Sequence, residues 1–193
     1  MALDSLQDLY LEHIQDLYSA ETQILDALPK MIDKASHAKL RDGFSQHLQQ
    51  TRQHAQRLED IAKRLNEDAS GKTCKGMEGL LKEGEDIVKA KGDENVIDAG
   101  LISAAQRVEH YEMAAYGCAR AYAEALGRDE DARLLQATLD EEGQTNEKLT
   151  QLAESVVNPD AQHRTRTDRE VATTPAQDRP GTTRPGREPE ARL

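Results

Sequence analysis

The sequence predicts an all-α protein, and three observations support this fold class. Residues that favour helices, namely Leu, Ala, Glu, Gln, Lys and Arg, dominate the 193-residue chain. Aromatic residues make up only 3% and Trp is absent, so residues that favour strands are scarce. Four long segments repeat apolar residues at helical spacing, and no Val, Ile or Thr run alternates with polar positions.

The first two helices are expected over residues 3–34 and from Ser36 to Leu65. Ser36 is a good N-cap residue, and Pro29 is expected to kink the first helix without ending it. The first helix has a stripe at heptad-like spacing: Tyr10, Ile14, Leu17, Glu21, Ile24, Leu28 and Met31. The corresponding stripe of the second is Leu40, Phe44, His47, Thr51, His54, Leu58, Ile61 and Leu65.

Two further long helices are expected after residue 92. One begins near Asp93 or Glu94 and ends before Gly127, a residue suited to the left-handed position after a helix. The other runs from Asp129 to about residue 157. Their stripes are Leu101, Ala105, Val108, Glu112, Ala115, Ala119 and Tyr122, and then Leu135, Thr138, Glu142, Thr145, Leu149, Leu152 and Val156.

The lengths of the connections predict the topology. Only a few residues join the first helix to the second and the third to the fourth, so each pair forms an antiparallel hairpin. About 30 residues separate the two hairpins, and they include a short helix expected over 76–89. One long crossover between two helical hairpins is the connectivity of a ferritin-like four-helix bundle. An up-down-up-down bundle ranks second, because it needs a short connection between the hairpins.

Each stripe is interrupted by polar residues at one place. Burying an isolated carboxylate is costly, so four coincident interruptions require polar partners or a cation. Residues equidistant from a tight turn lie at the same height in a hairpin. The midpoint of Glu21 and Thr51 is residue 36, and the midpoint of Glu112 and Glu142 is residue 127, which are the two predicted turns. The interruptions are therefore expected to form one layer.

This layer is interpreted as a site for two divalent metal ions, with iron or manganese favoured. Ferritin-like di-iron proteins carry Glu on two helices and Glu-x-x-His on the other two, whereas this chain has Thr51 and Thr145 in those motifs. The candidate ligands are Glu21, His47, His54, Glu109, Glu112 and Glu142. Residues expected to support them are Gln50, Thr51, Glu141 and Thr145. The alternative is a core without metal, in which hydrogen bonds satisfy these side chains. Tyr18, Tyr111 and Tyr116 are interpreted as packing residues.

Several segments resemble the YciE/YciF-type ferritin-like proteins, a bacterial stress-associated family. They are Tyr18–Glu21, His47–Glu59, Lys75–Leu80, Ala104–Glu112 (AAQRVEHYE, the most specific) and Leu139–Glu142. The resemblance implies a ferritin-like bundle over residues 1–157, a dinuclear iron or manganese site and a homodimer. Members of that family often have Glu where this chain has Gln50.

Composition and charge indicate a disordered C-terminal tail and disfavour nucleic-acid and membrane partners. Residues 158–193 contain five of the six prolines, many Thr and Arg and few large apolar side chains, so a disordered tail is predicted there. The net charge is −11 overall and −12 for residues 1–157, which disfavours binding to nucleic acid or an anionic membrane. No signal peptide or 18-residue apolar run is visible, and two cysteines make no disulfide framework, so a cytoplasmic protein is expected.

Two functions remain open on the sequence alone. The first is a di-metal carboxylate protein of the stress response that oxidises metal or consumes peroxide or O₂. The second is a metal-free helical scaffold that dimerises or binds a partner. Whether the protein is an enzyme is left open by the sequence.

Overall fold

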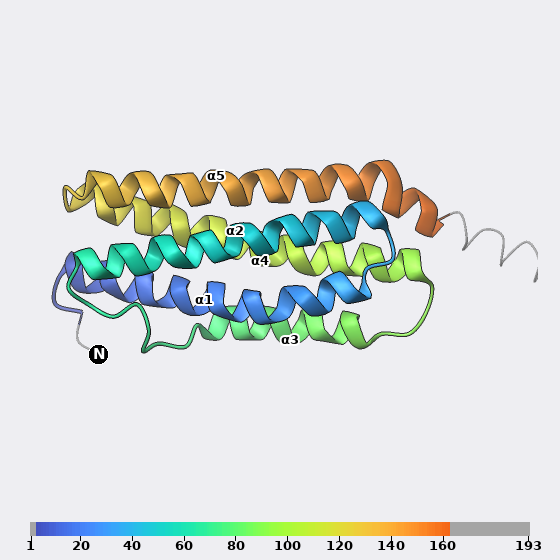
Figure 1. Cartoon of the computed structure of the whole chain (residues 1–193), viewed down its shortest axis with the longest axis horizontal. Coiled ribbons are helices and arrows are strands. Elements are labelled where there is room, and N and C mark those ends of the chain that lie inside the picture. The colour runs from blue at the N-terminus through green and yellow to red at the C-terminus, as the bar shows by residue number, and fades with distance from the viewer. Residues whose placement is uncertain (1–2, 163–193) are drawn as a thin grey trace, which may run out of the picture.

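The computed structural model describes residues 3–162, which contain helices and no strand (Figure 1). The helices are α1 (Leu6–Lys34), α2 (Ala38–Arg64), α3 (Lys75–Lys89), α4 (Glu94–Ala125) and α5 (Asp129–Leu152). A π-helical turn, η1 (Ala153–Val157), follows α5 directly. The predicted all-α fold class is confirmed, and α1 continues through Pro29. No helix in the described range is long and apolar enough to cross a membrane.

The four long helices form a bundle with ferritin-like connectivity. The pairs α1–α2 and α4–α5 are antiparallel hairpins, and α1 packs against α4 while α2 packs against α5 (Figure 1). The crossover between the hairpins carries α3, which lies along the outside of the bundle against α1 and α4. This is the arrangement that the long second connection predicted.

The last described residues remain helical. Helical backbone continues beyond η1 to residue 162, a few residues past the expected domain boundary at Val157. The rest of the segment predicted to be a disordered tail, residues 163–193, lies outside the described residues.

The carboxylate of Asp98, on α4 in the second hairpin, accepts hydrogen bonds from the turn between α1 and α2. The N-cap of α2 is His37 and not the predicted Ser36, and its side chain makes no capping hydrogen bond. Ser36 donates its backbone N–H and its hydroxyl to Asp98 of α4, at 2.9 and 2.6 Å. Asp98 also accepts the backbone N–H of His37 at 2.8 Å. The first N–H groups around this helix start are thus satisfied from α4, which ties the two hairpins together.

The second hairpin turn has the geometry expected from Gly127. This residue has φ +67°, and its N–H donates to the carbonyl of Glu124 at 3.0 Å. The next N–H, of Arg128, donates to the carbonyl of Ala123 at 2.9 Å. This pair of bonds is a Schellman motif, for which Gly is favoured because the left-handed conformation costs it nothing.

The core consists of two apolar clusters with polar residues between them. The cluster near the α1–α2 turn contains Ile24, Leu28, Leu40, Phe44 and Leu101, among others. The cluster near the α4–α5 turn contains Tyr10, Ile14, Leu58, Ile61 and Leu135, among others. Apolar burial in these clusters holds the four helices together on both sides of the polar layer.

The residues predicted to face the core in α1 and α2 match the buried residues closely. Toward the ends of α4 and α5, the buried residues lie one position after the predicted ones. In α4, Tyr116 and Ala123 are buried where Ala115 and Tyr122 were predicted. The 3.6-residue repeat of an α-helix drifts from a heptad pattern and causes this slip. Past Leu149, the buried residues are Ala153 and Val157, in place of Leu152 and Val156, because the wider η1 turn shifts the inward face.

Candidate metal centre

The structure brings all six candidate ligands together in one buried layer. Each of the four bundle helices contributes, and every one of these residues is at most 4% exposed. Glu21 comes from α1, His47 and His54 from α2, Glu109 and Glu112 from α4, and Glu142 from α5. The spacing of these residues along each helix and their distance from the turns were sufficient to predict that they lie in one layer.

The ligand atoms separate into two groups that share one carboxylate. One group contains His47, Glu109, Glu112 and Glu142, and the other contains Glu21, His54 and Glu142. Within each group, one nitrogen or oxygen from every residue lies within 4.8 Å of the others. Glu142 is the residue common to both groups, and a carboxylate with two oxygens is able to bind two cations.

Histidine nitrogens lie close to carboxylate oxygens in the layer. His54 Nδ1 is 2.8 Å from Glu142 Oε1 and 3.5 Å from Glu21 Oε1. His47 Nε2 is 3.4 Å from Glu109 Oε1, and its Nδ1 is 3.8 Å from Glu142 Oε2. Imidazole nitrogens and carboxylate oxygens are the donor types that suit iron, manganese and zinc.

Most of these buried polar atoms lack hydrogen bonds. Within residues 3–162, thirteen buried side-chain nitrogen and oxygen atoms have no hydrogen-bond partner, and nine of them belong to the six candidate ligands. They include both oxygens of Glu112, Oε2 of Glu142 and both ring nitrogens of His47. An unsatisfied buried polar atom costs free energy, and a bound cation would satisfy several of these at once.

The buried carboxylates outside the layer are fully partnered. Asp98 accepts three hydrogen bonds at the first turn, as described above. Asp131, only 2% exposed, pairs with Arg64 at 2.7 Å and with Arg128 at 2.6 Å. The fold can therefore satisfy a buried acid with protein donors, and it does not do so for Glu112. This contrast shows that the donor set of the layer fits a cation.

Burial and crowding shift the ionisation of the layer. Burial, and then the neighbouring carboxylates, raise the pKa of Glu109 and Glu112 well above the usual range, and burial also raises the pKa of Glu21. Burial lowers the pKa of His47. Burial alone would lower the pKa of His54, but Glu142 and Glu21 outweigh it and raise that pKa to about 10. Burial alone would also raise the pKa of Glu142, but His54 and His47 outweigh it and lower that pKa. Without a cation, the layer therefore favours neutral Glu109 and Glu112 beside an ionised Glu142 and a charged His54.

Tyr116 belongs to the layer although its residue type suggested packing alone. Its hydroxyl donates to Glu21 Oε1 at 2.5 Å, and the side chain is fully buried. Burial and the nearby carboxylates raise the pKa of Tyr116 well above its usual value. The signal for this contact was the four-residue step from Glu112, which keeps Tyr116 on the same face of α4.

Of the four residues expected to support the ligands, Glu141 contacts a candidate ligand side chain, and Thr145 bonds to its own helix. Thr145 bonds back to the carbonyl of Glu141 at 3.0 Å. Thr51 is buried in the layer, and neither its hydroxyl nor the Gln50 Oε1 oxygen has a hydrogen-bond partner among the described residues. Glu141 lies outside the layer, where its Oε2 is 2.7 Å from His54 Nε2.

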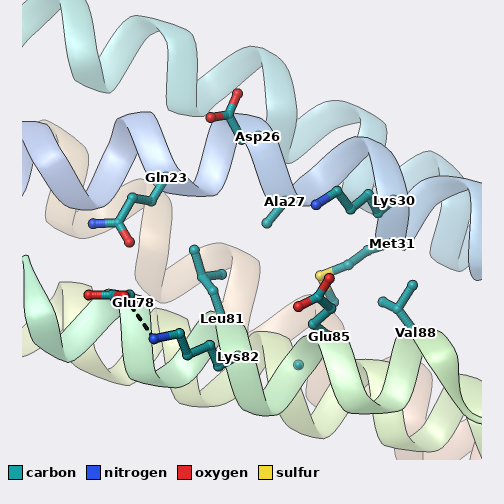
Figure 2. Close-up of a pocket in the computed structure, with 11 residues that line it drawn as sticks. Gln23, Asp26, Ala27, Lys30, Met31, Glu78, Leu81, Lys82, Glu85 and Val88 are labelled. Carbon is teal, nitrogen blue, oxygen red and sulfur yellow. Dashed lines mark hydrogen bonds and ion pairs between the residues drawn. The ribbon is translucent and has the colours of Figure 1, made fainter.

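A groove elsewhere on the molecule shares no residue with this layer. It lies between α1 and α3, and Figure 2 shows Met31, Leu81 and Val88 in it beside charged Lys30 and Glu85. Lys82 pairs with Glu78 at 2.8 Å along its side. None of the candidate ligands lines this groove.

Comparison with known proteins places the chain in a family. Residues 5–162 match the family described as a domain of unknown function, DUF892. The chain is 38% identical over 165 residues to Protein YciF of Escherichia coli strain K12, covering 85% of this chain and 99% of the relative. The chain belongs to the DUF892 family. The predicted resemblance to YciF-type proteins is thereby confirmed.

Solved structures agree with this assignment. The crystal structure of the Escherichia coli stress protein YciF aligns with a TM-score of 0.77 at 38% identity, over 80% of this chain and 98% of the other. YcfI from Rhodopseudomonas palustris aligns with a TM-score of 0.75 at 40% identity, over 77% of this chain and 95% of the other. A two-domain Anabaena variabilis protein that contains a ferritin-like domain aligns with a TM-score of 0.51 at 16% identity, over 94% of this chain and 42% of the other. The last likeness concerns the fold alone, and it supports the ferritin-like class.

Proposed function

We propose that this protein is a carboxylate-bridged di-metal protein, holding two iron or manganese ions, that acts in the bacterial stress response. The observation that carries the proposal is the pair of ligand groups that share Glu142, in which most of the buried nitrogen and oxygen atoms of the six residues make no hydrogen bond. The description of the Escherichia coli relative as a stress protein supports the physiological role.

In this proposal each residue has a defined task. Glu109, Glu112 and His47 would hold one ion, Glu21 and His54 would hold the other, and Glu142 would be a ligand available to both. When bound, iron or manganese supplies the redox chemistry for oxidising the metal itself or for consuming peroxide or O₂. The hydroxyl of Tyr116 fixes the orientation of Glu21, and the apolar clusters on both sides limit access of water to the layer.

A second candidate function is a metal-free scaffold that forms a homodimer. Two positions favour it: Gln50 is uncharged, and Thr145 stands where a second Glu-x-x-His motif would supply histidine. In that case the layer is inherited from a metal-binding ancestor, and the surface carries the function. Light scattering after size-exclusion chromatography measures the homodimer that both candidates allow.

Elemental analysis separates the two candidates. Protein purified without chelator is expected to contain iron or manganese at up to two ions per chain. The Glu21→Ala, Glu112→Ala double variant removes one ligand from each group, so it is expected to lose most of the metal. A matched variant with Glu124→Ala and Glu154→Ala, both at exposed positions, controls for the loss of two carboxylates. Wild-type protein without bound iron or manganese, even after incubation with either ion, would favour the scaffold.

A further inference from the structure

The two histidines of the layer are held in different ways. Both ring nitrogens of His47 face acids of the layer, Glu109 and Glu142. His54 instead uses its nitrogens on opposite sides. Its Nδ1 faces Glu142 at 2.8 Å and Glu21 at 3.5 Å, while its Nε2 lies 2.7 Å from Glu141 Oε2, outside the ligand groups. Only one edge of this imidazole is therefore turned toward a metal position.

Glu141 is itself held firmly by α2. Arg57 donates Nη1 to Glu141 Oε2 at 2.8 Å and Nη2 to Glu141 Oε1 at 3.1 Å, which is a two-bond pairing of guanidinium and carboxylate. The same Nη1 also donates to the hydroxyl of Thr138 on α5 at 2.9 Å. The side chains of Arg57 and Glu141 are 22% and 27% exposed. The ion pair that they form between α2 and α5 therefore lies between the surface and the fully buried His54.

Neighbouring residues on α5 thus reach the same imidazole from two sides. Glu142 approaches Nδ1 inside the layer, and Glu141 approaches Nε2 from outside it. A histidine that donates its Nε2–H to a carboxylate can bind metal through Nδ1 once the metal displaces the Nδ1 proton, and its ring orientation is fixed before the metal arrives.

We propose that Glu141, anchored by Arg57, is a positioning residue that fixes His54 with Nε2–H directed outward and Nδ1 directed at the metal ion shared with Glu21 and Glu142. This inference rests on the proposed function. The positioning carboxylate, Glu141, acts only on the group of Glu21, His54 and Glu142. In the other group, both ring nitrogens of His47 face ligand carboxylates, and no carboxylate outside the layer contacts His47 among the described residues.

The test compares metal affinity in matched variants of the full chain. Mn²⁺ is titrated into metal-free protein by calorimetry for wild type, Glu141→Ala, Glu141→Gln and Asp140→Asn. Glu141→Ala is expected to weaken one of two Mn²⁺ sites about 10- to 100-fold and to leave the other unchanged. Glu141→Gln keeps an oxygen that accepts the Nε2–H, so it is expected to recover most of that affinity. Asp140→Asn changes an exposed neighbour on α5 and is expected to match wild type.

A spectroscopic readout separates positioning from general stabilisation. In ¹⁵N-labelled protein loaded with Zn²⁺, His54 is expected to show a slowly exchanging Nε2–H signal that Glu141→Ala removes. A variant that melts at a lower temperature but retains both Mn²⁺ affinities and this signal would overturn the positioning role alone. Failure of wild-type protein to take up Mn²⁺ or Zn²⁺ would overturn the metal site itself, and the positioning role with it.

Discussion

Buried carboxylates of this bundle differ in how many donors they meet. Asp98 and Asp131 lie at the two turn ends and are satisfied by backbone N–H groups, arginines and hydroxyls. Glu112 lies at the centre, is fully buried, and has no hydrogen-bond partner on either oxygen among the described residues. Residue type and helical spacing are sufficient to place Glu112 in the layer. They do not show that Asp98 or Asp131 is buried, because the partners of both come from distant segments.

The ionisation of Glu112 leads to a prediction at the residue scale. Burial raises the folded-state pKa of Glu112 well above the usual glutamate value of 4.5, so the folded protein retains a proton that the unfolded chain has lost. In metal-free protein this contribution to stability is complete below pH 4.5 and is lost as pH rises toward the folded-state pKa, by about 1.4 kcal/mol per unit. Glu112→Gln does not ionise. It is therefore expected to be more stable than wild type at pH 8, with a smaller difference near pH 5.

Urea denaturation in the presence of chelator measures this difference at each pH. Glu154→Gln, at an exposed position on the same bundle, is the control and is expected to follow wild type at all pH values. A stability difference between Glu112→Gln and wild type that does not change between pH 5 and pH 8 would show that Glu112 is not held in its neutral form. Addition of Mn²⁺ is expected to reverse the order, because the variant lacks a ligand.

At the scale of elements, helix number, topology and the first hairpin were predictable, and the later register was not. Gly127 and the length of the crossover are local features of the sequence, whereas the start of α2 depends on Asp98 of the distant α4 and was predicted one residue early. Tyr116 was predicted to pack and instead bonds to Glu21, which is 95 residues away. Likewise, the π-helical turn η1 moves the inward face to Val157, and no local pattern in the sequence marks it.

Two glycines of α3 give a matched pair for testing how the crossover docks on the bundle. A Cβ at Gly76 would lie 2.8 Å from Cε2 of Tyr111, whose hydroxyl bonds to Asp16 at 2.8 Å and lies 2.9 Å from Cys74 Sγ. A Cβ at Gly79 would meet nothing within 4 Å. Gly76→Ala is therefore expected to lower the free energy of unfolding by about 1–3 kcal/mol through overpacking.

The control substitution on the same helix is expected to act in the opposite direction. Gly79→Ala replaces an exposed glycine within a helix and is expected to raise stability by up to about 1 kcal/mol. Thermal and urea unfolding of both variants provide the measurement. If Gly76→Ala were as stabilising as Gly79→Ala, the contact of α3 with Tyr111 would be looser than the structure shows.

At the scale of the whole molecule, the bundle consists of two apolar clusters with a polar layer between them. The layer draws residues from all four long helices, so a cation bound there would connect both hairpins. The same layer without a cation contains acids that burial drives toward their neutral forms. The ligand types and their meeting point were predictable from the sequence. Their division into two groups around Glu142 was not, because it depends on side-chain directions across the bundle.

Crystallography with anomalous scattering at the manganese absorption edge tests this division most directly. Crystals of the full chain soaked in Mn²⁺ are expected to show two anomalous peaks about 3.5–4 Å apart, the spacing of two-metal sites. One peak should lie among His47, Glu109 and Glu112, the other between Glu21 and His54, and Glu142 should contact both. Absence of anomalous density in the layer, or peaks only at surface carboxylates, would contradict the account.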